Sequence, residues 1–226
     1  MQKRITTKKR VVSNMNPEFW HSRWAENRIG FHLTDINPLL VEYWPTLKPQ
    51  RNERVLVPMC GKSNDLVWLA ERHNQVVGIE LSDIAVKAFF AENLYTPLVT
   101  GVGHQLTYEF DEITIHCGDF FATQIEPVEL VYDRAALVAM PQELRQAYAN
   151  HLLSLTAENG RILLVSLDYP QAEMAGPPFS VDQQEIEQLF SGCKVSRLAR
   201  DEGDENHPRI KQGVSRFAEE VWLIER

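Results

Sequence analysis

Short apolar segments that alternate with amphipathic ones are the feature that most constrains how this chain can fold. Strands that are each followed by a helix are typical of an open, mostly parallel sheet with helices on both faces. We expect the helix over 141–156 to end at Asn159-Gly160, a pair that favours helix termination. The expected strands are 54–58, 75–80, 113–117, 129–133 and 161–167, and the expected helices are 18–24, 37–44, 66–72, 83–93, 141–156 and 180–190.

The last part of the chain departs from this alternation. Residues 193–200 and 216–226 both alternate like strands, and a long charged segment, 201–211, separates them. Two successive strands without a crossover helix predict an antiparallel hairpin at one edge of the sheet. Added to the strands before it, the hairpin predicts an α/β fold with a mostly parallel seven-stranded sheet. A chain of 226 residues suits one such domain.

Three aromatic residues precede the first strand and lie outside the repeating pattern. Trp20 and Trp24 are spaced for one face of a helix, and Phe31 follows the glycine at which that helix should end. Aromatic stripes of this kind usually belong to a core, but a segment before the first strand can also fold over a ligand as a lid. We therefore expect residues 15–226 to form a single domain, with a helical lid over residues 15–50.

The net charge of −8 makes the chain a poor candidate for nucleic-acid binding, although residues 1–14 are basic. That segment leaves open a basic arm for nucleic acid or a membrane. We expect it instead to be disordered or an extension, because Met15-Asn16-Pro17 is typical of a natural start. The odd count of 3 cysteines, the absence of CxxC spacing and the scattered histidines favour reduced thiols, a cytoplasmic location and no bound metal.

Candidate ligand residues follow the expected strands, at the edge where a doubly wound sheet binds its ligands. The loop after 54–58 has one glycine, Gly61, where a dinucleotide-binding loop has three, so it suits an uncharged part of a ligand better than a pyrophosphate. Glu80 ends the next strand and is placed to accept hydrogen bonds from ribose hydroxyls. The loop alone could be an ordinary turn, but together with Glu80 it favours a nucleoside site.

Two residue pairs follow the next strands. In Asp119-Phe120 the acid can face an adenine amino group and the ring offers an apolar surface, although a plain turn explains this pair equally well. Asp133-Arg134 could be a structural ion pair. A guanidinium beside a reacting sulfur would instead favour the thiolate over the thiol, which makes Arg134 the more informative member.

Six stretches of the chain occur together in one family. They are Phe19-Trp20-His21-Ser22-Arg23-Trp24, Gly30-Phe31-His32, Pro58-Met59-Cys60-Gly61-Lys62, Val77-Gly78-Ile79-Glu80, Tyr132-Asp133-Arg134-Ala135-Ala136-Leu137-Val138-Ala139 and Gly176-Pro177-Pro178-Phe179. On these stretches the chain resembles the bacterial thiopurine S-methyltransferases. The resemblance implies a Rossmann-like class I methyltransferase fold, whose sheet ends in an antiparallel hairpin. It also implies S-adenosyl-L-methionine as the methyl donor and S-adenosyl-L-homocysteine as the product.

The resemblance also implies roles for individual residues. Phe31 falls where the family contacts the acceptor, and we expect Arg134 to act in catalysis by favouring the acceptor anion. A basic residue of the segment 201–216, such as Arg209 or Lys211, could assist it. The residues implied to bind the donor are Trp20, Trp24, Met59, Glu80, Asp119, Phe120 and Arg134.

The expected reaction is methyl transfer to the sulfur of thiopurines or similar small aromatic thiols. We expect a cytoplasmic monomer that binds neither nucleic acid nor membrane. A related methyltransferase acting on selenium, tellurium, halide or other small thiols stays open, because acceptor pockets lie on variable loops. The missing glycines argue against a nicotinamide oxidoreductase, and a nucleic-acid binder would depend on the basic segment alone.

Overall fold

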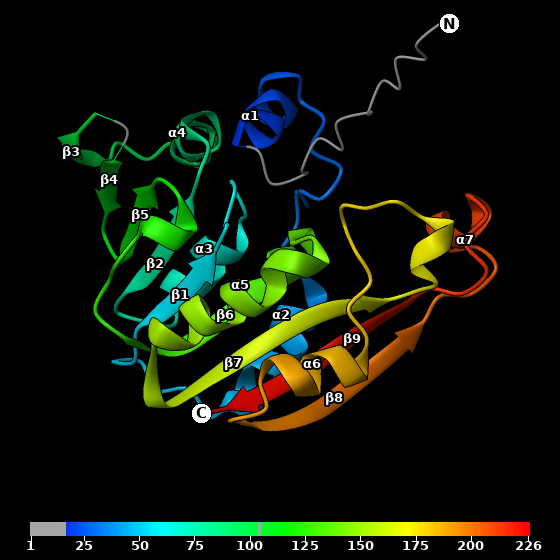
Figure 1. Cartoon of the computed structure of the whole chain (residues 1–226). Coiled ribbons are helices and arrows are strands. Elements are labelled where there is room, and N and C mark those ends of the chain that lie inside the picture. The colour runs from blue at the N-terminus through cyan, green and yellow to red at the C-terminus, as the bar shows by residue number, and fades with distance from the viewer. Residues whose placement is uncertain (1–16, 104) are drawn as a thin grey trace, which may run out of the picture.

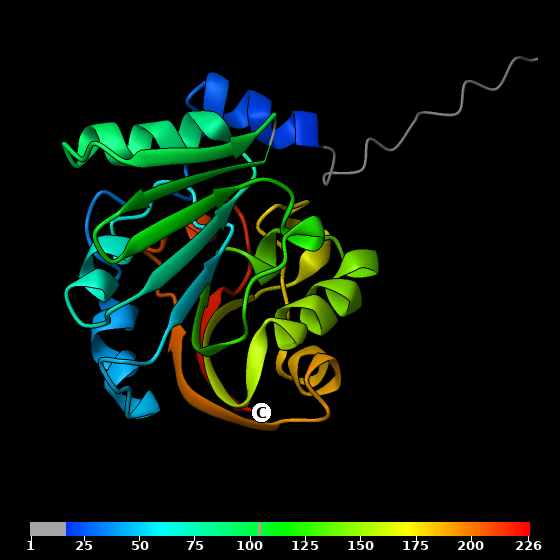
Figure 2. The same ribbon diagram turned by 90° about the vertical axis from the view of Figure 1, so that its left-hand side faces the viewer.

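The computed structural model describes residues 17–103 and 105–226, so the basic segment 1–14 lies outside the described residues. One sheet runs through this part of the chain, with its strands in the order β3-β4-β5-β2-β1-β6-β7-β9-β8. Helices cover both faces of the sheet, as Figure 1 and Figure 2 show from two directions.

Five parallel strands form the centre of the sheet. β2 pairs with β1 and β5, and β6 pairs with β1 and β7, in every case parallel. All residues of β1 and β2 are buried, which explains why these segments are apolar in the sequence up to the terminal Glu80 of β2. The predicted parallel core is therefore confirmed. Its strands are β1 (Val55–Pro58), β2 (Val76–Glu80), β5 (Ile113–Cys117), β6 (Val128–Arg134) and β7 (Thr156–Asp168).

The predicted C-terminal hairpin is also confirmed. It consists of β8 (Lys194–Glu202) and β9 (Ala218–Glu225), which pair antiparallel to each other. β9 also pairs antiparallel to β7. The last strand of the chain therefore lies between β7 and β8 rather than at the edge (Figure 1).

The sheet has two strands more than the seven predicted. β3 (Leu98–Val102) and β4 (Gln105–Phe110) form a second hairpin, and β4 pairs antiparallel to β5. Every residue of β3 is exposed, so this strand has no alternation of buried and exposed positions that a sequence pattern could reveal. The predicted count is corrected to the nine strands of the sheet.

One predicted helix end is wrong. α5 (Gln142–Ser154) ends before β7 begins at Thr156, so Asn159-Gly160 lies inside a strand and does not cap the helix. Thr156 pairs with Val128 of β6, and the register then shifts before the regular pairing resumes at Arg161. Residues 157–160 lie where the register shifts, which explains why their sequence resembles a turn.

Two apolar clusters lie on opposite faces of the sheet. α5 and α6 pack into one cluster, and α2, α3 and α4 into the other. Among the described residues, no helix is both long enough and apolar enough to cross a bilayer. The remaining helices are α1 (Pro17–Ala25), α2 (Pro38–Tyr43), α3 (Asp65–Ala70), α4 (Asp83–Glu92), α6 (Gln183–Leu189) and α7 (Pro208–Lys211), and the 3₁₀ turns are η1 (Trp44–Leu47), η2 (Phe120–Ala122), η3 (Leu137–Ala139) and η4 (Gln171–Glu173).

Candidate active site

A cavity of about 660 Å³ lies at the carboxyl ends of the central strands. Residues that end or follow β1, β2, β5 and β6 form its floor, which is the position expected for ligands of an open parallel sheet. α1 and the loop after it form another wall, and α1 also packs against α4 across the end of the sheet (Figure 2). The remaining lining includes Pro177, Pro178 and Arg209, from segments that follow β7 and β8.

Glu80 is a buried carboxylate in this cavity. Its Oε2 accepts the N–H of Gly61 over 2.9 Å, and its Oε1 accepts the N–H of Ser82 over 2.8 Å. Burial raises the pKa of the Glu80 carboxyl to about 6, and these two N–H groups limit the rise. Since a carboxylate can accept about four hydrogen bonds, Glu80 can still accept two from a ligand.

The loop after β1 brings the backbone close to an indole ring. Met59 and Gly61 both have positive φ, of 48° and 55°. A Cβ at Gly61 would lie 2.9 Å from Cζ2 of Trp24, so this position requires glycine both for its φ and for the space. The single glycine noted in the sequence therefore lets Trp24 of α1 pack onto the β1 loop.

Three aromatic residues of the expected lid lie together over the cavity. The rings of Trp20 and Trp24 each contact Phe31 edge-on, with centroid distances of 5.8 and 5.6 Å. All three residues line the cavity, while only Trp24 is also fully buried. The interpretation as plain core is thus incomplete for Trp20 and Phe31, because both face the cavity.

Asp119 and Phe120 also reach the cavity. Asp119 caps the turn η2 by accepting the N–H of Phe121 at Oδ1 over 3.0 Å. Phe120 is buried and packs against Tyr148 and His151 of α5, with centroid distances of 5.1 and 4.9 Å. Asp119 and Phe120 can therefore form a turn and also contact a ligand in the cavity.

Arg134 lies in a smaller neighbouring cavity of about 40 Å³. Trp24, Phe31, Met59 and Ala135 line both cavities, so the two adjoin. The Nη1 group of Arg134 donates to the carbonyl oxygen of Phe31 over 3.1 Å, which joins the end of β6 to the lid. The guanidinium thus lies beside the main cavity rather than in its lining.

Asp133 does not form the ion pair with Arg134 that the sequence left open. Its Oδ2 accepts the hydroxyl of Tyr148 over 2.7 Å, and its Oδ1 accepts the N–H of Leu137 over 3.1 Å. Burial raises the pKa of the Asp133 carboxyl to about 6. Asp133 therefore ties the turn after β6, where Ala135 has a φ of 63°, to helix α5.

Sequence reasoning missed several lining residues. Arg23 lies three positions after Trp20 and so on the same helix face, a spacing that could have revealed it. Arg28, Met140 and Leu144 also line the cavity, without a comparable signal in the sequence. Arg209 lines the cavity, whereas Lys211, the other basic residue considered from the same segment, is not part of the lining.

Comparisons with known proteins show which family the chain is similar to. The chain matches the family model for thiopurine S-methyltransferase over residues 15–226. It is 66% identical over 211 residues to the thiopurine S-methyltransferase of Photobacterium profundum, covering 93% of this chain and 99% of that protein. It is 63% identical over 212 residues to that of Aliivibrio fischeri strain ES114, covering 93% of this chain and 100% of that protein.

Solved structures support the fold. A 1,6-didemethyltoxoflavin-N1-methyltransferase of Burkholderia thailandensis, with bound S-adenosylhomocysteine, superimposes with a TM-score of 0.63 at 13% identity, covering 93% of this chain and 86% of that chain. The N-methyltransferase NodS of Bradyrhizobium japonicum, in complex with S-adenosyl-L-homocysteine, gives 0.62 at 10% identity, covering 91% and 97%. The predicted class I methyltransferase fold is therefore confirmed.

Proposed function

Because this chain belongs to the thiopurine S-methyltransferase family, we propose that it transfers a methyl group from S-adenosyl-L-methionine to the sulfur of thiopurines or similar small aromatic or heterocyclic thiols. The observation that carries this proposal is the cavity of about 660 Å³, which combines the buried carboxylate Glu80 with the guanidinium of Arg209. Glu80 comes from the end of β2, and Arg209 comes from α7, near the β9 side of the sheet (Figure 1).

The floor of the cavity fits the donor. Glu80 has acceptor capacity for two ribose hydroxyls, and Met59 and Phe120 offer apolar surfaces to the adenosine. The carboxylates of Glu80 and Asp119 suit a ligand with a positively charged sulfur. Bound there, S-adenosyl-L-methionine supplies an electrophilic methyl group. Trp20 and Trp24 would cover it with aromatic faces, which attract a cation.

The rest of the lining fits the acceptor. Phe31, Met140, Pro177 and Pro178 present apolar surfaces that suit a flat ring, and Arg209 adds a positive charge. A nearby cation stabilises a thiolate relative to a thiol. Arg209, with Arg134 in the adjoining cavity, would therefore hold the acceptor in its reactive form.

The protein contributes position and charge to this reaction rather than a covalent step. The electron pair of the acceptor thiolate forms the new sulfur–carbon bond as the donor's carbon–sulfur bond breaks, which converts a sulfonium into a neutral thioether. No proton leaves during this step, because the acceptor is already ionised. Holding the two reactants in line can account for roughly 7–11 kcal/mol of the barrier.

The lid, the absence of a nucleic-acid partner, the location and the oligomeric state are further parts of this proposal. Within the expected lid of residues 15–50, the described part up to Phe31 acts as the lid, because Trp20, Trp24 and Phe31 cover the cavity from one side, whereas α2 packs into the apolar cluster with α3 and α4. The net charge of −8 argues against nucleic acid as a partner. We expect a cytoplasmic monomer. Size-exclusion chromatography with light scattering would test the oligomeric state.

Calorimetry and a turnover assay test the proposed function together. S-adenosyl-L-homocysteine should bind, whereas NADH should not. In the presence of S-adenosyl-L-methionine the protein should methylate 6-mercaptopurine faster than it methylates selenite or iodide. Absence of binding to S-adenosyl-L-homocysteine would overturn the proposal, and faster turnover of selenite or iodide would reassign the acceptor while keeping the donor.

A further inference from the structure

The acceptor wall is built from two segments outside the central strands. Pro177 and Pro178 lie in the loop between β7 and α6, and Arg209 lies on α7 between β8 and β9. Their relative position is not fixed by the sheet, since neither segment pairs with a strand at these residues. Contacts behind the cavity must therefore hold them together.

An aromatic stack connects the two segments. The ring of Phe217 lies parallel to that of His207 at 4.4 Å and to that of Tyr169 at 6.0 Å, with interplanar angles of 20° and 13°. Phe217 and Tyr169 are buried. The stack begins at the end of β7, passes the start of β9 and reaches the residue before α7.

Both ends of this stack reach the cavity lining through hydrogen bonds. The Tyr169 hydroxyl donates to the carbonyl oxygen of Pro178 over 2.7 Å. At the other end, Nδ1 of His207 accepts the N–H of Arg209 over 3.2 Å and so caps α7. Pro178, Tyr169, Phe217, His207 and Arg209 are thus linked by successive contacts.

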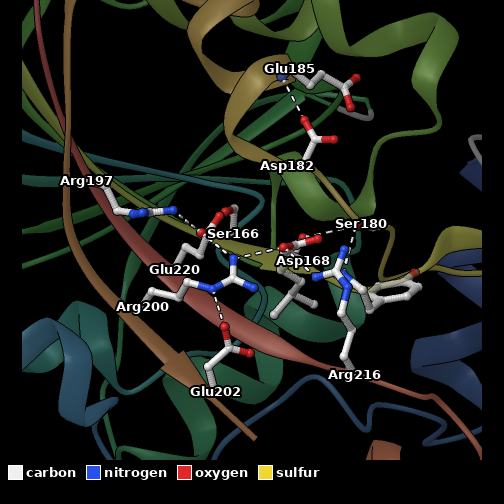
Figure 3. Close-up of polar contacts among 12 residues, drawn as sticks. Ser166, Asp168, Ser180, Asp182, Glu185, Arg197, Arg200, Glu202, Arg216 and Glu220 are labelled. Carbon is white, nitrogen blue, oxygen red and sulfur yellow. Dashed lines mark hydrogen bonds and ion pairs between the residues drawn. The ribbon is translucent and has the colours of Figure 1, made fainter.

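An ion-pair network around the buried carboxylates of Asp168 and Glu220 fixes the stack to the sheet. Oδ2 of Asp168 accepts from Nη1 of Arg216 over 2.7 Å and from Nη1 of Arg200 over 2.8 Å (Figure 3). Burial alone would raise the pKa of Asp168, but the two guanidinium groups outweigh it, and the pKa lies below its ordinary value. Arg200 also donates to the buried Glu220 of β9 over 2.7 Å. Asp168 directly precedes Tyr169 in the chain, and Arg216 directly precedes Phe217, so each partner of this ion pair adjoins a residue of the stack.

We infer that Tyr169, Phe217 and His207, anchored by Asp168 and Arg216, are positioning residues that set Arg209 against Pro178 and thereby control acceptor binding. None of these five residues belongs to the described lining of the cavity, so they act through Arg209 and Pro178. The inference rests on the proposed function, because it assigns the acceptor to this wall. Their effect should fall on the acceptor and leave the donor site at Glu80 unchanged.

Two conservative variants test the stack and its anchor. Tyr169→Phe removes only the hydroxyl that donates to Pro178, and Arg216→Gln removes one of the two guanidinium groups that hold Asp168. Each should raise KM for 6-mercaptopurine about fivefold to tenfold, because small displacements of positioning groups have large effects on productive binding. The Kd for S-adenosyl-L-homocysteine should not change. Arg216→Lys should restore part of the lost acceptor affinity, which a general loss of packing would not allow.

A matched control lies on the same hairpin. Lys194 pairs with Glu225 over 2.5 Å at the opposite end of β8 and β9, far from the Glu202 and Ala218 end that adjoins α7. Lys194→Gln also removes an ion pair of the hairpin but should leave both KM and Kd as in the natural chain. The melting temperature of every variant shows whether it is folded.

The outcomes separate this inference from the proposed function. If the natural chain binds S-adenosyl-L-homocysteine and methylates 6-mercaptopurine but folded Tyr169→Phe and Arg216→Gln keep its KM, the positioning role is wrong and the function stands. A parallel loss of donor affinity in these variants would also refute the positioning role. A natural chain without either activity would instead refute the proposed function.

Discussion

The proposed donor and acceptor sides of the cavity are built in different ways. The donor side consists of residues at the carboxyl ends of β1, β2, β5 and β6, where pairing of parallel strands and backbone hydrogen bonds to Glu80 fix the geometry. The acceptor side consists of Phe31 in the loop after α1, the 176–179 loop and α7, and side-chain contacts hold the last two segments. A site of this kind can keep its donor while its acceptor changes, because the second side can be rebuilt without altering the sheet.

Replacing Glu80 should have the largest effect and should separate the two sides most clearly. Glu80→Gln removes the charge proposed to accept hydrogen bonds from the ribose hydroxyls and places an amide against the N–H groups of Gly61 and Ser82. We expect Kd for S-adenosyl-L-homocysteine to rise about 100-fold, because hydrogen bonds to charged groups contribute roughly 1.5–3 kcal/mol each. Calorimetry measures this change. A change in KM for 6-mercaptopurine alone would contradict the division into two sides.

Gly61→Ala should weaken the donor side by a different route. The new Cβ would meet the indole of Trp24 at 2.9 Å, and the φ of +55° is unfavourable for alanine. We expect roughly tenfold weaker donor binding and about 1–2 kcal/mol lower stability in denaturant unfolding, since a positive φ strains alanine. Gly192→Ala is the control, because a Cβ there would meet nothing within 4 Å. Equal behaviour of the two variants would mean that the Trp24 contact has no part in donor binding.

Arg209→Gln should affect only the acceptor side. Loss of its charge should raise KM for 6-mercaptopurine about tenfold, as expected when a thiolate loses a nearby cation. Steady-state kinetics at saturating donor measures this effect. Lys211→Gln, on the same helix but outside the described lining, should leave KM unchanged. If Lys211→Gln were the more damaging variant, the assignment of the acceptor wall would need revision.

The pH dependence of donor binding should be the smallest effect. Glu80 has a pKa of about 6 in the folded chain, above its ordinary value of 4.5. Ionised Glu80 therefore destabilises the fold, and this destabilisation is lost as the pH falls from 6 towards 4.5. Donor binding should follow the opposite direction, because ribose hydroxyls bind best to the ionised carboxylate. Affinity for S-adenosyl-L-homocysteine should therefore fall severalfold between pH 7 and pH 5.5.

The control for this pH dependence is Glu80→Gln. Asp133 has a similarly raised pKa of about 6, so a pH effect alone does not identify the responsible group. The dependence should disappear in Glu80→Gln if Glu80 is responsible. Its persistence in that variant would assign the effect to another group.

The same contrast explains what the sequence could predict. Strand ends follow from apolar runs, so Met59, Glu80 and Asp119 could be placed at one edge of the sheet, and all three line the cavity. Arg134 could be placed on the correct strand, but its guanidinium bonds to the carbonyl oxygen of Phe31, a contact across 103 positions that no local pattern shows. The five-residue strand β3 was missed because none of its residues is buried.

The acceptor wall was the hardest part to predict. From the sequence, the 201–211 segment could be recognised only as charged and long. That Arg209 and not Lys211 lines the cavity depends on the short helix α7. That helix is positioned by His207 and Phe217, which contact each other through tertiary packing rather than through a periodic pattern. Sequence periodicity indicates which face of an element is buried, and a helix of four residues is too short to show such a pattern.

The interior position of β9 has a consequence for the synthesis of the chain. β7 and β8 are both complete before β9 emerges from the ribosome, yet β7 has only β6 beside it and β8 has no strand to pair with until residues 218–225 are available. Until then the β7 edge, which is largely apolar, is open to pairing with other chains. The sheet is therefore completed only when β9 has been translated. A nascent or shortened chain that lacks β9 should depend on chaperones to avoid aggregation.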